Sequence, residues 1–262
     1  MNYRTVAITG ASSGIGAALA QRLAAPGRLL VLMARNAERL EHVAETCRAK
    51  AATCRKIDID VRDRDRIVTA CEDLDRELGF DLLIANAGIL DGRRADEIVE
   101  SGTTARQVLE TNLLATIDVI HAVLPGMRRR RRGSIVLVSS LAAFFPLTDA
   151  PAYSASKAAL VSYGVALRSA LSGQGVNVVV ACPGFVITPM SDDHVGAHPD
   201  AVTADDAARR ILAGLDANRA LIGFPAVPFW LSRLSLLVPE SWRRRDADKT
   251  RFHVRPRPPA ET

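Results

Sequence analysis

The sequence predicts an α/β protein with a single doubly wound parallel sheet of the Rossmann type and helices on both faces. Short apolar runs of strand length alternate with helical stretches along most of the chain. Strands that alternate with helices form βαβ units, and these give a parallel sheet that is covered on both faces. The first apolar run ends in a glycine-rich turn that leads into a helix, as in nucleotide-binding sheets.

Most predicted strands are short, largely apolar runs that end at turn residues or at a helical stretch, and the third, Lys56-Ile57-Asp58-Ile59, alternates charged and apolar residues. In chain order these runs are residues 5–9, 29–34, 56–59, 82–85, 135–139 and 176–181, with a last strand expected at 221–224. The predicted helices are residues 15–24, 37–49, 65–77, 104–127, 153–171 and 203–215. The second helix carries its apolar residues on one face, and Thr203 is a good N-cap for the last.

The 262 residues contain no internal repeat and no linker rich in proline, glycine or serine, so one domain spanning 1–262 is predicted. Nearly half of the residues (48%) are apolar, which suits one large α/β domain. Only the tail, from about residue 246 to 262, is charged and then proline-rich, and this tail is expected to be loose.

The cysteines and the N-terminus indicate where the protein works. Cys47, Cys54, Cys71 and Cys182 form no Cys-x-x-Cys motif and have no paired histidines, which argues against a disulfide framework or a metal site and favours the reducing cytosol. The N-terminus has no signal-peptide apolar block, and no apolar run is long enough to cross a bilayer. A soluble cytoplasmic protein without a transmembrane span is expected.

A run of five arginines, residues 128–132, supplies much of the formal net charge of +5. The run follows a predicted helix, and cations are favourable at a helix C-terminus, so a solvated helix end is expected. Nucleic-acid binding is the alternative interpretation, but no aromatic or groove-binding motif accompanies the run. No nucleic-acid partner is therefore predicted.

Tyr153 and Lys157 are the first candidate catalytic residues. Four residues apart on a predicted helix, their side chains share one face. An ammonium near a phenol favours the phenolate and is expected to lower the tyrosine pKa from its usual ~10. Such a tyrosine can exchange a proton with a substrate oxygen near neutral pH. The alternative is an exposed helix face, since this spacing also arises by chance.

The glycine-rich turn between the first strand and the first helix is a candidate phosphate site. Its glycines, Gly10, Gly14 and Gly16, let the backbone approach a pyrophosphate at a helix N-terminus. Ser12, Ser13 and Ile15 lie between them and are included in the candidate cofactor site. The spacing is Gly-x-x-x-Gly-x-Gly rather than the common dinucleotide fingerprint, and an ordinary turn is the alternative.

Arg35, at the end of the second predicted strand, bears on which nicotinamide cofactor binds. NAD-binding sheets usually carry an acid at this point, and none is present here. An arginine suits a 2′-phosphate because its planar fork binds phosphate oxygens in pairs. NADP(H) is therefore favoured over NAD(H), although Ser13 supplies no second cation.

With the three glycines and the tyrosine–lysine pair in one chain, the sequence resembles the short-chain dehydrogenase/reductase family from about residue 5 to 190. The resemblance places Asn112, Ser140, Tyr153 and Lys157 in the catalytic site, with Ser139 as the alternative serine. It also places Asp60 and Val61 at the adenine, Asn86, Ala87 and Gly88 in a turn beside the cofactor, and Pro183, Gly184 and Thr188 along the nicotinamide. Ala85 replaces an asparagine that often precedes this turn.

The resemblance implies hydride transfer between NADP(H) and an alcohol or carbonyl substrate. In reduction, Tyr153 donates a proton to the substrate oxygen and Ser140 hydrogen-bonds it. Lys157 lowers the tyrosine pKa and contacts the nicotinamide ribose, and Asn112 holds a water that relays protons. A non-catalytic NADP(H)-binding regulator on the same fold is the alternative function, although such a protein is expected to lack the tyrosine or the lysine.

In this family the segment after the sixth strand, here about 185–239, selects the substrate. Phe144, Phe145, Phe229 and Trp230 are apolar enough to line a pocket, which favours a lipophilic alcohol, ketone or acyl chain. The apolar residues 225–238 can instead form an interface between copies or a helix on the core, with weak membrane-surface contact as a further alternative. The family implies a homodimer or homotetramer.

Overall fold

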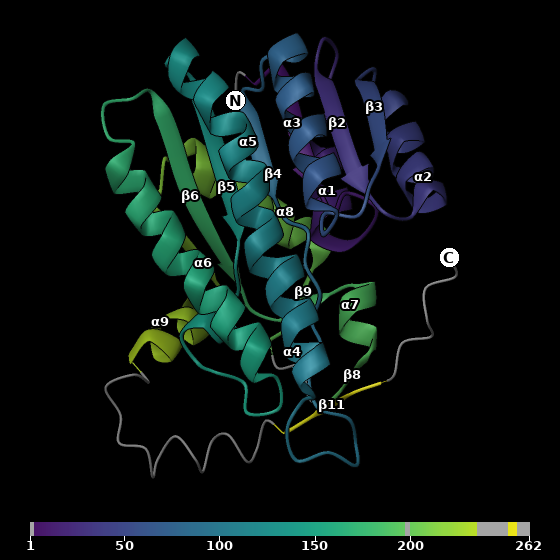
Figure 1. Cartoon of the computed structure of the whole chain (residues 1–262), viewed down its shortest axis with the longest axis vertical. Coiled ribbons are helices and arrows are strands. Elements are labelled where there is room, and N and C mark those ends of the chain that lie inside the picture. The colour runs from purple at the N-terminus through teal and green to yellow at the C-terminus, as the bar shows by residue number, and fades with distance from the viewer. Residues whose placement is uncertain (1–2, 197–199, 235–250, 256–262) are drawn as a thin grey trace.

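The computed structural model describes residues 3–196, 200–234 and 251–255, and its centre is a seven-stranded, fully parallel sheet (Figure 1). The strands are β1 Thr5–Thr9, β2 Leu29–Ala34, β3 Thr53–Asp58, β4 Leu82–Ala85, β5 Gly133–Val138, β6 Val176–Pro183 and β10 Leu221–Phe224. Their order is β10-β6-β5-β4-β1-β2-β3. The predicted fold class, a doubly wound parallel sheet, is confirmed.

Helices cover both faces of the sheet because its strands send alternate apolar side chains to opposite sides. On one face lie α1 Gly14–Leu23, α2 Ala37–Arg48 and α8 Ala204–Asp216, which pack with Val6 and Ile8 of β1. On the other lie α3 Arg64–Leu78, α5 Ala115–Arg130 and α6 Pro151–Ala170, which pack with Ala7. Both clusters are fully apolar at their centres.

The predicted helix at 104–127 is continuous but not uniform. It consists of α4 Gly102–Leu109, a π-helical turn over Glu110–Leu114, and α5. A π-helical turn is rare and occurs often at functional sites. The turn contains Asn112, whose contacts are described below. The third strand also differs, since it begins at Thr53 rather than at residue 56, and its mostly exposed edge position explains why it lacks a strong apolar pattern.

Short elements complete the fold around the carboxyl ends of the strands. They are η2 Leu141–Ala143, β7 Val186–Ile187, α7 Pro189–Asp192, β8 His194–Val195, β9 Val202–Thr203, α9 Ala226–Leu234 and β11 His253–Val254. The prediction that the tail is loose is wrong for residues 251–255, because β11 pairs antiparallel with β8. The remainder of the predicted tail lies outside the described residues.

Among the described residues, one helical stretch, Gly102–Arg130, is long and apolar enough to cross a membrane by length and composition, with a mean hydropathy of 1.3. More than half of its most apolar window (56%) is buried inside the protein. Val119, Ile120 and Val123 of this stretch lie in the core beneath the sheet. This burial is the pattern of a core helix.

Two of the five arginines in the run pair with carboxylates. Arg130 binds Asp75 with an Nη2–Oδ1 distance of 2.6 Å, and Arg132 binds Asp81. Burial of Asp81 opposes its ionisation, but hydrogen bonds from Arg132 and from two backbone amides lower the pKa of Asp81. All five arginines are exposed, as expected for a solvated helix end, and the two ion pairs fix part of the run to the scaffold.

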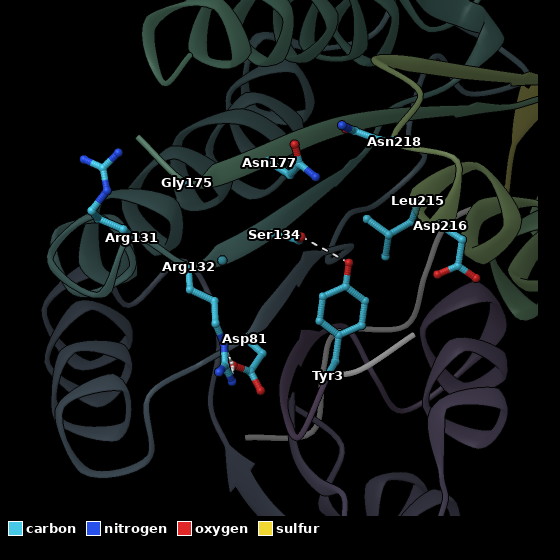
Figure 2. A pocket seen from close by; sticks show the side chains of 11 residues that line it. Tyr3, Asp81, Arg131, Arg132, Ser134, Gly175, Asn177, Leu215, Asp216 and Asn218 are labelled. Carbon is cyan, nitrogen blue, oxygen red and sulfur yellow. Dashed lines mark hydrogen bonds and ion pairs between the residues drawn. The ribbon is translucent and has the colours of Figure 1, made fainter. Parts of the chain in front are cut away.

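A polar pocket of about 400 Å³ lies at the amino-terminal ends of the strands. Figure 2 shows Tyr3 donating its hydroxyl to Ser134 there, with Arg132 beside Asp81. Ligands of open α/β sheets bind instead at the carboxyl ends of the strands. We therefore assign this pocket to the scaffold.

Candidate active site

The glycine-rich turn between β1 and α1 leaves no room for side chains. Gly10 and Gly14 have φ values of +66° and +54°, a region that glycine adopts readily. A Cβ added to Gly16 would lie 2.2 Å from the carbonyl oxygen of Gly10. Ser13 is the N-cap residue of α1, and Ile15 lies in its first turn beside the core. Ser12 completes the turn. The turn is therefore a backbone cradle at a helix N-terminus, which is the arrangement that binds phosphate.

Asn86 fixes this cradle to the end of β4. Its Nδ2 donates to the carbonyl oxygens of Thr9 and Gly10, at 3.1 and 3.2 Å. The hydroxyl of Thr9 in turn accepts from the backbone amides of Asn86 and Ala87. Asn86 therefore acts in this structure by holding the loop after β4 against the cradle.

Asn112 is fully buried in the π-helical turn, and its side-chain amide is occupied by hydrogen bonds. Its Oδ1 accepts from the amide of Ile89 at 2.8 Å, and its Nδ2 donates to the Ile89 carbonyl and to Ser156 Oγ. These contacts join the loop after β4 to α6. The side chain therefore positions these two segments relative to each other, and the relaying water expected at Asn112 stays a prediction.

Ser140, rather than Ser139, faces Tyr153. The Ser139 hydroxyl donates to the backbone carbonyl of Lys157 at 2.7 Å, and that residue is buried. Ser140 follows β5, and its hydroxyl lies close enough to the Tyr153 phenol to lower the pKa of that group. Its Oγ also accepts from the backbone amide of Ala142, which fixes the hydroxyl in place. Two hydroxyls thus meet at one point, where a substrate oxygen can accept from both.

Lys157 lies beneath Tyr153 on the same face of α6. Its Nζ donates to the carbonyl of Val138 at 3.0 Å and lies 5.6 Å from the centre of the Tyr153 ring. A Cβ added to Gly88 would lie 3.5 Å from the same Nζ. Gly88 is therefore close to the ammonium group, and the loop after β4 meets the catalytic helix there.

Burial shifts both titrating groups of this pair. It raises the pKa of Tyr153, and the hydrogen bond with Ser140 lowers that pKa by less. Burial also lowers the pKa of Lys157 to about 8. The expectation that Lys157 depresses the tyrosine pKa is not met here, because loss of hydration dominates. A tyrosine with a raised pKa is protonated at neutral pH, so the proton that a reduction requires is present.

At the end of β2, Arg35 is more than half exposed, and its Nη1 lies 3.7 Å from Asp60. Asp60 accepts from the backbone and guanidinium of Arg62, with an Nη2–Oδ2 distance of 2.6 Å. Although burial opposes ionisation, these hydrogen bonds lower the pKa of Asp60. A second arginine therefore lies beside the same carboxylate as Arg35. In this structure Asp60 binds the guanidinium groups of Arg35 and Arg62, and its predicted contact with the adenine stays a prediction. The neighbouring Val61 is buried in the core.

The end of β6 approaches the glycine cradle from the other side. Pro183 ends β6, and the amide of Gly184 donates to the carbonyl of Phe224 at 2.8 Å. Thr188 lies against the cradle, because a Cβ added to Gly14 would be 3.0 Å from its Cγ2. Thr188 is also the N-cap residue of α7. Thr188, which was predicted to lie along the nicotinamide, and Gly14, which was predicted to bind phosphate, are therefore neighbours at the carboxyl edge of the sheet.

The predicted aromatic residues come from the turn after Ser140 and from helix α9. Phe144 and Phe229 meet edge to face with ring centres 5.9 Å apart, and Arg233 lies over both rings. Phe229 is buried, whereas Trp230 is 59% exposed. Phe145 is half-buried in the same loop as Phe144. Helix α9 therefore lies on the core through Phe229, and residues 235–238 of the predicted apolar stretch lie outside the described residues.

Several contributors to the site gave no recognisable sequence signal. Ser156 binds Asn112, Arg62 binds Asp60, and Asp149 anchors the C-terminal segment. Each is defined by a contact between residues distant in the chain or in a loop. The arginine at position 62 could have been noticed, because it lies two residues after the predicted adenine contact.

These observations test whether a nicotinamide dinucleotide fits the site. Of the described residues, the cradle offers backbone amides at the N-terminus of α1, and its glycines admit no side chain. Arg35 offers an exposed guanidinium beyond the next strand. Lys157 offers a buried donor at the opposite end, beside Tyr153. The donor set fits a dinucleotide laid across the carboxyl edge of the sheet.

Comparison with known proteins agrees with this geometry. Residues 4–197 match the family model described as short chain dehydrogenase. An uncharacterized oxidoreductase of Myxococcus xanthus is 35% identical over 243 residues, which cover 91% of this chain and 94% of the relative.

Two solved structures also resemble the whole chain. A short-chain dehydrogenase from Sphingobium yanoikuyae in complex with NADPH is 26% identical, with a TM-score of 0.78 over 94% of this chain and 96% of that one. A bulky-bulky ketone specific alcohol dehydrogenase from Comamonas testosteroni is 25% identical, with a TM-score of 0.76 over 95% and 93% of the two chains.

Proposed function

Since the chain belongs to the short-chain dehydrogenase family and is an oxidoreductase with a nucleotide-binding Rossmann fold, we propose that it interconverts a lipophilic alcohol and its ketone with NADP(H). The observation that carries the proposal is the placement of the Tyr153 phenol beside the Ser140 hydroxyl, which lowers its pKa, and over the buried ammonium of Lys157.

The residues of the site divide the chemistry of ketone reduction between them. When bound, the nicotinamide supplies the hydride. Ser140 and Tyr153 together hold the carbonyl oxygen, and two donors aimed at that oxygen favour the negative charge that develops on it. Tyr153 then transfers its phenolic proton to the oxygen.

Lys157 stabilises the phenolate that remains. Its ammonium faces the Tyr153 ring at 5.6 Å, in a buried place where charges interact more strongly than in water. The same Nζ is within reach of a ribose hydroxyl, as the family resemblance implies. Oxidation of the alcohol runs through the same groups in reverse.

The preference for NADP(H) rests on Arg35 and on its neighbour. The Arg35 guanidinium is exposed at the end of β2, where the 2′ position of the adenosine ribose comes to lie in such sheets. Arg62 lies on the same carboxylate and adds positive charge. The NADPH complex of the Sphingobium relative supports this choice.

A lipophilic substrate is supported by the ring pair in the turn after Ser140. Phe144 follows Ser140 by four residues, and its ring packs on that of Phe229. The similar Comamonas enzyme is specific for ketones that are bulky on both sides. We therefore propose a ketone with apolar substituents as the substrate class.

Helix α9 also bears on the assembly of the protein. Its Val227, Trp230, Leu231 and Leu234 are each more than half exposed. We propose that this apolar face joins copies of the chain in a homodimer or homotetramer, with contact to a membrane surface as the alternative. The four cysteines are free thiols, which supports a reducing cytosolic location.

A carbonyl panel run with NADPH and with NADH tests the proposed function. Absorbance at the nicotinamide band is followed with aryl alkyl ketones, aliphatic ketones and sugars. We expect consumption of NADPH with apolar ketones and slower consumption of NADH. Turnover of hydrophilic sugars alone would contradict the lipophilic substrate, and no turnover in either direction with any compound would contradict the reaction.

A further inference from the structure

We propose that the C-terminal segment Arg251–Arg255 forms a wall of the substrate site and that Phe252 selects substrates by the bulk of the group beside the carbonyl. This inference rests on the proposed function, because it takes Tyr153 as the point where the substrate oxygen binds. The segment is remote from the site in sequence. The family match ends at residue 197, so the wall is not part of the matched region.

The segment places two apolar side chains beside the catalytic tyrosine. Phe252 and Val254 are 3% and 1% exposed and form a small core cluster with Ala150. Leu90 and Tyr153 pack against this cluster, as does Leu147. Phe252 and Tyr153 therefore belong to one cluster of side chains, and an apolar group on a substrate held at Tyr153 can contact Phe252.

The inward and outward residues of the segment alternate as in a strand with one buried face. Phe252 and Val254 are buried, His253 is half-buried, and Arg251 and Arg255 are exposed. Alternate side chains of a strand point to opposite sides. The apolar face is turned toward the cluster that holds Tyr153, and the charged face is turned away from it.

One end of the segment is tied to the start of the catalytic helix. Asp149, which is 1% exposed, accepts from the amide of Phe252 at 2.8 Å and binds Arg251 at 3.0 Å. Arg93, from the loop after β4, binds the same carboxylate. Asp149 lies four residues before Tyr153, so this anchor fixes the segment relative to the proton donor.

The other end of the segment is tied to the loop after β6. β11 pairs antiparallel with β8, and the amide of Arg255 donates to the carbonyl of Asp193 at 2.9 Å. The amide of Val254 donates to the carbonyl of Arg93. Figure 1 shows β11 beside β8, at the end of the molecule that carries α7. Anchors on three loops hold Phe252 in a fixed place, as selection by shape requires.

The test compares Phe252→Ala with the wild type on aryl ketones whose alkyl group grows from methyl to octyl. Binding is measured by calorimetry with NADP⁺ present, and turnover by NADPH consumption. We expect the ratio of kcat/KM for the octyl ketone to that for the methyl ketone to rise at least about tenfold, since a pocket wall discriminates at about this level. Phe252→Leu should move the ratio in the same direction by less, and it guards against a variant that fails to fold.

Two matched controls separate the wall from general loosening. His253→Ala alters the outward side of the same strand and should leave the ratio unchanged. Arg251→Ala removes the side-chain anchor and should shift the ratio, whereas Arg255→Ala, which is held here through its backbone, should not. The dissociation constant of NADPH should stay the same in all variants.

The outcomes distinguish this inference from the proposed function. A wild type that reduces the ketones, with the same chain-length profile in Phe252→Ala, would overturn the wall and leave the function standing. A wild type that binds the ketones without reducing them, with a binding profile that Phe252→Ala shifts, would support the wall and overturn the function. A shift in both profiles supports both.

Discussion

The buried ammonium of Lys157 should cost the folded protein stability, and Lys157→Met should therefore make the protein more stable while removing its activity. The lysine is 5% exposed, and burial lowers its pKa from 10.5 to about 8. A difference of about 2.5 pKa units corresponds to about 3 kcal/mol at pH 7, at ~1.4 kcal/mol per unit. The methionine variant also loses the hydrogen bond from Lys157 to the Val138 carbonyl, which lowers its free energy of unfolding by about 1 kcal/mol. The net gain is about 2 kcal/mol.

The pH dependence gives the sign of this effect. Because the pKa is lower in the folded than in the unfolded chain, the unfolded chain binds more protons between pH 8 and 10.5. Wild-type stability thus gains from this group as the pH rises through that window. At pH 10 the cost has fallen to about 1 kcal/mol, so the advantage of the methionine variant nearly vanishes.

Urea unfolding at pH 7 and at pH 10 measures the effect, with Lys50→Met as the control. Lys50 is exposed, so its replacement should change the free energy of unfolding by less than about 0.5 kcal/mol at either pH. Other groups that titrate near pH 10 are common to all three proteins and cancel in the differences. A Lys157→Met variant less stable than the wild type at pH 7, or a difference that does not change with pH, would refute the reasoning.

Three further substitutions test the cofactor site and the scaffold. Gly16→Ala places a Cβ 2.2 Å from a carbonyl oxygen of the cradle and should weaken NADPH binding at least about tenfold by fluorescence titration, whereas Gly102→Ala meets no atom within 4 Å and should not. Arg35→Ala should raise the dissociation constant of NADPH about tenfold and leave that of NADH unchanged, with the exposed Arg39→Ala as the control; equal losses for both cofactors would contradict the assignment. Asp81→Asn should lower the free energy of unfolding by about 1–3 kcal/mol at pH 7, and by less as the pH falls through the lowered pKa of Asp81. Urea unfolding at pH 7 and at pH 3 measures this difference. A loss that does not change with pH would count against the ion pair between Asp81 and Arg132.

The strands and most helices could be predicted because their burial is local in the sequence. The run 82–85 is apolar throughout and 5–9 is apolar between its two terminal threonines, and the structure confirms both as buried central strands. β3 was placed less well, since an edge strand with Arg55 and Lys56 carries no continuous apolar run. Edge strands often carry such charges, which discourage pairing with other chains.

The π-helical turn could not be predicted because it depends on tertiary contacts. Residues 104–127 have an uninterrupted helical pattern, and nothing local marks an extra residue at 110–114. The turn holds Asn112 where Ile89 and Ser156 bind its amide. Those partners come from another loop and another helix, and the sequence does not bring them together.

The order and type of the site residues in the sequence were enough to select them, but the direction of the Tyr153 pKa shift was predicted wrongly. The prediction of a lowered tyrosine pKa considered the charge of Lys157 and omitted the loss of water around Tyr153. Likewise, composition predicted a loose tail because it is charged and proline-rich. Residues 251–255 are nevertheless anchored: Phe252 binds Asp149 and β11 pairs with β8, and both contacts join parts of the chain that are far apart.

Turnover by Tyr153→Phe, measured together with NADPH binding, tests the central claim most directly. The variant keeps the ring that packs on the cluster of Phe252 and removes only the hydroxyl, whose pKa Ser140 lowers. On a ketone that the wild type reduces, we expect the rate to fall about a thousandfold, while the dissociation constant of NADPH stays within about threefold. A variant that reduces the same ketone within about tenfold of the wild-type rate would contradict Tyr153 as the proton donor.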